Sequence, residues 1–230
     1  MLKGRSDNSI NADSFKTGEG YRECISKRMR LPTNSEKDTN LFLIVLVSIF
    51  LLFVLTVSFV TISGSSMMPT LHSSGELVFV SKFSTPTYGD IVIIDNLDGE
   101  LGKGGGDIGK KLLIKRVVAL GGDTVQYFFD ETGEVVLKVN GEVVEEDYIT
   151  PLPSRDELDE DGYMDEFSHN RFVKYEYKVP DDCVFVLGDN RVTSEDSRTF
   201  GYNNTVEAVN RDRLRGVVFL AIGSGGIRLI

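Results

Sequence analysis

The chain has 230 residues, a length that allows one or two domains and is ample for a buried core. Its formal net charge of -10 argues against binding to the phosphate backbone of nucleic acid, which requires a basic face. Two cysteines, Cys24 and Cys183, are too few for a disulfide framework. The two histidines, His72 and His169, lack the spacing of zinc ligands. We therefore expect no metal, no cofactor and no nucleic-acid partner.

The N-terminal part of the chain changes abruptly from polar to apolar. Residues 1–40 are rich in Ser, Asn, Lys and Glu without a periodic pattern, which is typical of a largely disordered tail. Residues 41–62 form an apolar run of 22 residues, which as a helix would be about 33 Å long and would cross a hydrocarbon core of roughly 30 Å. A buried core helix is the alternative, but such helices rarely lack a polar face. The run predicts one transmembrane helix over 41–62.

The charges that flank this run predict its orientation. Four basic residues lie near its N-terminal end, Lys27, Arg28, Arg30 and Lys37, whereas residues 63–74 contain no Asp, Glu, Lys or Arg. Cytoplasmic flanks of membrane helices are enriched in Lys and Arg. We expect a single-pass protein of the cell membrane with a cytoplasmic N-terminus, and residues 63–230 as an extracytoplasmic domain.

Residues 63–230 contain short runs of strand-forming residues separated by turn signals. The predicted strands are Glu76–Phe83, Asp90–Asp95, Lys110–Leu120, Asp123–Phe129, Glu134–Asn140 and Cys183–Asp189. Asn140-Gly141 is a strong hairpin signal. Helical periodicity is absent apart from a short turn near Thr205–Leu214. The glycine-rich stretch 102–109 indicates a flexible connection, and the acidic stretch 151–171 a surface insertion.

The segment directly after the apolar run is unusually rich in hydroxyl groups. It reads Ser-Gly-Ser-Ser-Met-Met-Pro-Thr-Leu over Ser63–Leu71. Four hydroxyls and a proline beside a bilayer could form a simple stalk. The same hydroxyls could include a nucleophile if a base lies nearby in the fold.

A possible base is present in the strand Leu112–Val118. Lys115 and Arg116 are adjacent, so they point to opposite faces of that strand, and one of them is on the same face as Leu113 and Val117. Arginine stays charged, but burial can lower the pKa of a lysine by several units from about 10.4. A neutral amine can activate a serine without any histidine. The alternative is a half-exposed lysine whose amine reaches solvent.

A third segment, Leu187–Gly201, combines charged and hydroxyl side chains directly after an apolar strand. Such a loop is often a solvated turn. It can also form a buried scaffold in which carboxylates pair with arginines and a hydroxyl holds an amine in place.

Taken together, the three segments resemble the type I signal peptidases. Ser63–Leu71 is similar to the serine box of that family, in which the serine before Met-x-Pro is the nucleophile. Tyr88-Gly-Asp-Ile-Val-Ile is similar to the family's Gly-Asp strand, and Ile114-Lys-Arg-Val-Val with Gly122-Asp123 to its lysine box. Gly188-Asp-Asn-Arg and Ser194-x-Asp-Ser-Arg198 are similar to its last box. Four weak motifs in the family's order after one N-terminal span make a specific combination.

The resemblance implies a mainly β fold, with an antiparallel β-sheet catalytic domain over 63–230, a small β-ribbon insertion at about 127–178, and one preceding transmembrane helix. It implies Ser66 as the nucleophile and Lys115 as the general base. The supporting residues that it implies are Ser194, which orients the lysine, the ion pair of Asp196 and Arg198, and Asp189 and Arg191 in the same loop.

The resemblance also implies how the site meets its substrate. The Ser66 N–H would be one oxyanion donor, while Gly64 replaces a serine that supplies a second donor in some members. This glycine is typical of the single-span Gram-positive subgroup. The implied substrates are signal peptides of exported preproteins with small residues one and three positions before the cut. The implied pocket residues are Ile62, Met67, Leu113 and Ile114, and the other implied partners are the lipid bilayer and the secretion translocon.

Two other interpretations remain open from the residues. The chain could be a Ser/Lys processing peptidase of a specialised secretion or conjugation system; a relative of the SOS-repressor type is the weaker form of this alternative, because those proteins carry a DNA-binding head. It could also be a membrane-tethered β domain that only binds a partner.

Overall fold

The computed structural model describes residues 34–72, 74–97, 99, 101, 111–150, 152, 154, 175–202 and 205–230. The predicted disordered tail up to residue 33, the glycine-rich connection and nearly all of the acidic insertion lie outside the described residues. The chain divides into two compact units, residues 1–52 and 53–230.

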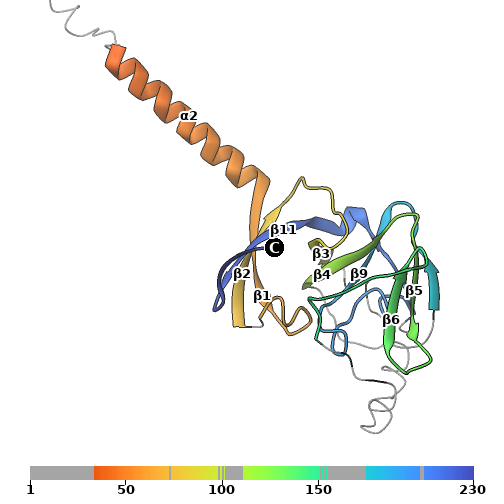
Figure 1. The fold of residues 1–230 in the computed structure, drawn as a ribbon. Coiled ribbons are helices and arrows are strands. Elements are labelled where there is room, and N and C mark those ends of the chain that lie inside the picture. The colour runs from red at the N-terminus through yellow and green to blue at the C-terminus, as the bar shows by residue number, and fades with distance from the viewer. Residues whose placement is uncertain are drawn as a thin grey trace, which may run out of the picture. The chain divides into compact units, whose positions relative to one another are not determined.

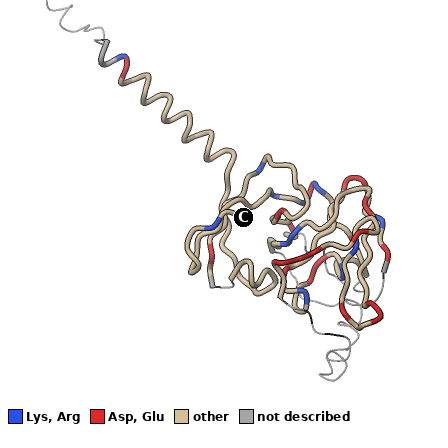
Figure 2. Tube along the Cα trace, in the orientation of Figure 1, with Lys and Arg blue, Asp and Glu red and all other residues tan. Residues whose placement is uncertain are grey.

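Helix α2 (Asn34–Thr56) contains most of the predicted membrane span. Its part from Lys37 to Thr56 is long and apolar enough to cross a membrane, and Figure 2 shows that its charged residues are confined to its first turns. The predicted end of the span at Ile62 is wrong, because the helix ends at Thr56 and β1 (Val57–Ser63) follows at once. Hydropathy does not separate a lipid-facing helix from a sheet strand, but the β-branched residues of Val57–Ser63 favour the strand.

The rest of the described chain forms two antiparallel sheets (Figure 1). The large sheet contains β1, β2 (Ser74–Ser81), β3 (Ile91–Asn96), β4 (Lys111–Leu120), β9 (Cys183–Leu187), β10 (Val209–Asn210), β11 (Leu214–Gly223) and β12 (Gly226–Leu229). The small sheet contains β5 (Thr124–Phe129), β6 (Val135–Val139), β7 (Glu142–Val143) and β8 (Tyr175–Lys178). The predicted mainly β domain behind one apolar helix is confirmed.

The order of the large sheet is β1-β2-β11-β3-β4-β9-β10, with β12 paired to β11. Strand β11 therefore lies between β2 and β3, which are neighbours in sequence. Neither β11 nor β12 was among the predicted strands. A short 3₁₀ helix, η3 (Arg211–Arg213), leads into β11 and matches the helical turn expected near residue 210.

The small sheet is an insertion between β4 and β9, and it starts at Thr124, slightly before the boundary of 127 expected from the family. The predicted hairpin at Asn140-Gly141 joins β6 to β7, and both turn residues have positive φ, at 54° and 85°. A turn with positive φ at both central residues matches the twist of antiparallel strands, which explains the Asn-Gly pair.

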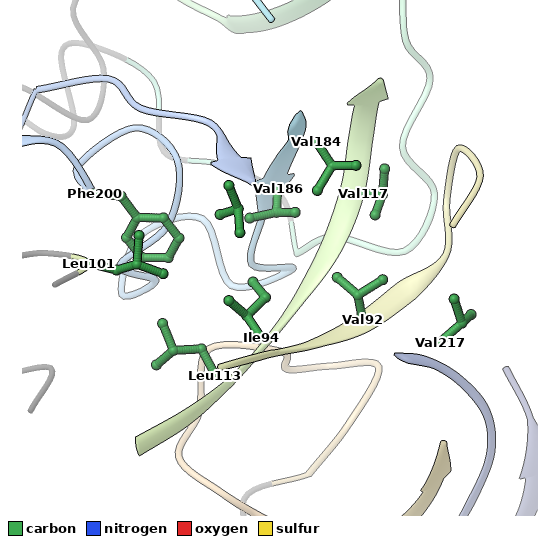
Figure 3. Close-up of a cluster of buried hydrophobic side chains, with 10 residues drawn as sticks. Val92, Ile94, Leu101, Leu113, Val117, Val184, Val186, Phe200 and Val217 are labelled. Atoms are coloured by element: carbon green, nitrogen blue, oxygen red, sulfur yellow. The ribbon is translucent and has the colours of Figure 1, made fainter. Parts of the chain in front are cut away.

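Three buried apolar clusters stabilise the unit of residues 53–230. One packs Val92, Leu113, Val186 and Phe200 with their neighbours beside β3, β4 and β9 (Figure 3). The second joins β9 to the small sheet through residues such as Tyr127 and Phe185. The third lies beneath the segment that follows β1 and contains Met67 and Leu71. Burial of each large apolar side chain stabilises the fold by about 1.5–3 kcal/mol.

Candidate active site

Ser66 lies in the turn that connects β1 to β2. The chain enters the turn through Gly64, whose φ of 105° disfavours any residue with a side chain. Two backbone bonds close the turn: Met68 N–H donates to the Ser65 carbonyl (3.1 Å), and Leu71 N–H donates to the Met67 carbonyl (2.9 Å). Met67 and Leu71 are fully buried, so the turn is fixed to the core while Ser66 stays half-buried above it.

Lys115 reaches the Ser66 hydroxyl from β4. Its Nζ lies 3.0 Å from Ser66 Oγ and 2.9 Å from the Ile114 carbonyl oxygen, to which it donates. The residue is only 3% exposed, and Leu113 and Val117 lie on the same face of β4. A hydroxyl and an amine at hydrogen-bond distance, shielded from water, can act as nucleophile and base. The two residues are 49 positions apart in sequence, so the fold alone brings them together.

The loop that follows β9 holds the serine turn from the other side. Asn190 N–H donates to the Ser66 carbonyl at 3.0 Å. Gly188 is required here because a Cβ at this position would lie 2.1 Å from Ser194 Oγ and 2.6 Å from the Ser66 carbonyl oxygen. The glycine therefore allows a close approach of the two segments.

Three ion pairs stabilise this loop. Asp196 and Arg198 are completely buried and their side chains meet at 2.8 Å, so the ion pair that the family resemblance implies is present. The two other pairs join the loop to distant strands and loops: Arg116 of β4 pairs with Asp189 at 2.6 Å, and Arg191 pairs with Glu146. Removing one partner from a buried pair typically costs 3–5 kcal/mol because the other charge stays buried.

The Asp196 carboxylate is the most strongly perturbed acid of the loop. Burial alone would raise its pKa, but the charge and hydrogen bonds of Arg198 and the Gly188 N–H outweigh burial and lower the pKa to about 2. Ser194 Oγ lies close enough to contribute to this shift, although its geometry falls short of a hydrogen bond. The role of Ser194 in orienting Lys115 therefore stays a prediction.

A cleft of about 350 Å³ opens over the serine and the lysine. It is lined by Ser63, Gly64, Ser65, Ser66, Leu112, Leu113, Ile114, Lys115, Thr193 and Glu195. Of the predicted pocket residues, Leu113 and Ile114 line the cleft, whereas Ile62 and Met67 are buried in the apolar cluster beneath the turn. The side chains of this lining give no set of metal ligands, and no group of three or more His, Cys, Asp or Glu in the described part of the chain could hold a metal ion.

One edge of β4 is open where it borders the cleft. β3 pairs with β4 from Lys111 to Arg116, but β9 pairs with β4 only from Arg116 to Leu120. The stretch 111–115 therefore has a neighbour on one side only within the large sheet. Such an edge can pair with an extended peptide through main-chain hydrogen bonds.

An arginine of the C-terminal strand also contacts the serine turn. Arg228 of β12 donates to the Thr70 carbonyl at 2.8 Å and to Glu76 Oε2 at 2.7 Å. The Glu76 side chain is fully buried and also accepts from the His72 N–H at 3.2 Å. Sequence reasoning missed this contact, since the partners are more than 150 positions apart and share no motif.

A known protein family matches most of this chain. The sequence model of the family described as signal peptidase, peptidase S26, matches residues 37–220 of the chain. The chain belongs to this family.

Relatives within the signal peptidase family include three bacterial proteins. The signal peptidase I of Bacillus caldolyticus is 38% identical over 141 residues, which cover 61% of this chain and 69% of the relative. Signal peptidase I P of Bacillus subtilis subsp. natto is 32% identical over 194 residues, which cover 82% of this chain and 92% of the relative. A crystal structure of a signal peptidase I from Enterococcus faecalis is 25% identical with a TM-score of 0.36, covering 58% of this chain and 97% of that one.

Proposed function

We propose that this protein is a membrane-anchored serine endopeptidase that removes N-terminal signal peptides from exported preproteins, with Ser66 as nucleophile and Lys115 as general base. The observation that carries the assignment is the 3.0 Å separation of Lys115 Nζ from Ser66 Oγ, with the amine almost completely buried. Membership of the signal peptidase family supports the substrate class.

The chemistry needs only these two side chains and the backbone. Neutral Lys115 accepts the hydroxyl proton as Ser66 Oγ attacks the scissile carbonyl, and an ester bond to the enzyme forms. The C–N bond breaks as the lysine passes its proton to the leaving amine. Lys115 then takes a proton from water as the water attacks the ester carbonyl. The bond from that carbonyl carbon to Ser66 Oγ breaks, Lys115 returns the proton to Oγ, and the signal peptide leaves with a new carboxyl group.

The oxyanion of each tetrahedral intermediate requires hydrogen-bond donors. The Ser66 N–H makes no hydrogen bond with any residue in the described part of the chain, so it is available for this role. Gly64, which also lines the cleft, leaves space beside it for a second donor from water or backbone.

The substrate would bind as an extended strand along the open edge of β4. Leu113 and Ile114 would then form shallow apolar contacts that accept small side chains next to the cut. Helix α2 would anchor the enzyme in the bilayer with its N-terminus in the cytoplasm, since basic residues precede it, and the translocon would deliver the substrate.

The test is cleavage of a preprotein with alanine one and three positions before the cut, by the detergent-solubilised full chain. We expect Ser66→Ala and Lys115→Arg to lower kcat/KM by at least about a thousandfold. Arginine keeps the positive charge and loses the base, so it separates catalysis from electrostatics. Lys82→Arg, at an exposed lysine just after β2, is the matched control and should keep full activity.

The pH profile gives an independent test of the amine base. We expect activity to rise with pH along an acidic limb and to be highest on the alkaline side, because only the neutral lysine accepts a proton. Near wild-type cleavage by Lys115→Arg, or a flat rate between pH 5 and about 9, would contradict the assignment. A domain that only binds a partner would show no cleavage, and binding would be insensitive to Ser66→Ala.

A further inference from the structure

The lining of the cleft includes an acidic side chain, Glu195, that has no role in the proposed mechanism. Glu195 is half-buried and lines the cleft together with Ser66 and Lys115. It lies between Ser194 and Asp196 in the loop after β9, and the same cleft is also lined by Leu113 and its neighbours in β4.

The other acidic and basic side chains around this loop neutralise one another. Both aspartates and both arginines of the loop take part in the three ion pairs described above. Their partners from outside the loop are Arg116 of β4 and Glu146 of the insertion. Glu195 alone among the charged groups of the loop has no hydrogen bond or ion pair with any described residue.

The charge of the cleft therefore depends on Glu195 when the site is ready to react. The other ionisable side chain of the lining is Lys115, which must be neutral to act as a base. A carboxylate that faces a cleft without a partner attracts a cationic side chain of the bound peptide and repels an anionic one.

We infer that Glu195 is a specificity-determining residue that favours substrates with a lysine or arginine near the scissile bond over substrates with an acidic residue there. This inference rests on the proposed function. The small residues one and three positions before the cut point toward the shallow pockets, so the side chain that meets Glu195 belongs to the second position before the cut or to the first two positions after it.

The experiment compares Lys, Gln and Glu at each of these three positions in one otherwise constant preprotein peptide. For the wild-type full chain at low salt, we expect kcat/KM at one position or more to be highest with Lys, intermediate with Gln and lowest with Glu. The kcat/KM of the lysine peptide should exceed that of the glutamate peptide about fivefold, which is the size of effect expected for a partly exposed charge pair. The ratio should fall toward one in 0.5 M salt, where the screening length is only about 4 Å and exposed charges farther apart than this are largely screened.

Two variants test the role of the carboxylate itself. Glu195→Gln should bring the ratio of lysine to glutamate substrate close to one, and Glu195→Lys should invert it. Glu131→Gln, which removes an exposed carboxylate from the turn between β5 and β6, is the matched control and should leave the ratio unchanged.

The outcomes separate this inference from the proposed function. If the wild type cleaves the glutamine peptides but Glu195→Gln has the same charge ratio as the wild type at all three positions, the inference is wrong and the proposed function stands. If the wild type cleaves none of the peptides, including those with glutamine, the proposed function itself fails.

Discussion

Replacing Gly188 with alanine should displace the serine turn without removing any of the proposed reactive groups. The added Cβ would lie 2.1 Å from Ser194 Oγ and 2.6 Å from the Ser66 carbonyl oxygen, whereas ordinary contacts begin near 3.4 Å. One of the two segments must therefore move by about 1 Å. Overpacking of this kind costs roughly 1–3 kcal/mol of stability. A displacement of about 1 Å at reacting groups can lower the rate about a hundredfold.

The displacement should also weaken the hydrogen bond from the Asn190 N–H to the Ser66 carbonyl, which joins the serine turn to the loop after β9. The assay is preprotein cleavage together with chemical denaturation of the detergent-solubilised full chain. Gly225→Ala is a suitable control, because a Cβ there meets its nearest neighbour at an ordinary 3.5 Å. If Gly188→Ala shows the denaturation midpoint and kcat/KM of the wild type, then the close approach of these segments does not position the serine.

Two further predictions concern the ion pairs near the serine turn. Arg228→Gln should lower kcat about tenfold with little change in KM, since the Thr70 carbonyl loses a charged donor. Arg228→Lys, which still pairs with Glu76, should recover part of the lost kcat. Equal losses of kcat in both variants would contradict a positioning role. The low pKa of Asp196, about 2 beside Arg198, means that the folded state holds the carboxylate charged more strongly than the unfolded state. It thus contributes about 2 kcal/mol above pH 4, which is lost as the pH falls toward 2. The difference in free energy of unfolding between wild type and Asp196→Asn should shrink over that window, and a constant difference would refute the shift.

The sequence predicted most of the fold where local pattern decides it. The Asn140-Gly141 turn and the strands around it follow from backbone preferences that act over a few residues. The predicted end of the apolar helix was wrong because hydropathy does not distinguish Val57–Ile62 from the helix before it, although its β-branched residues favour the strand that pairs with β2. Strand β11 contains Gly216, which weakens its strand pattern, and the missed strand is stabilised by two neighbours far away in sequence.

The candidate site was predictable to the extent that single residues carry its chemistry. Ser66 and Lys115 each lie in a motif of their own, so both could be named without a structure. The partners of Arg116 and Arg191 could not, because pairing with Asp189 and Glu146 depends on which strands meet and in which register.

The position of β11 in the large sheet has a consequence for how the protein is made. The turn with Ser66 is carried by β1 and β2, and Lys115 by β4, which is joined to β3; β11 is the strand that connects these two pairs. Strand β11 begins 99 positions after Lys115 in the chain, so the ribosome makes it well after both residues. A growing chain thus contains Ser66 and Lys115 well before β11 can join their two strand pairs, and the sheet does not hold the two side chains together until β11 has been synthesised.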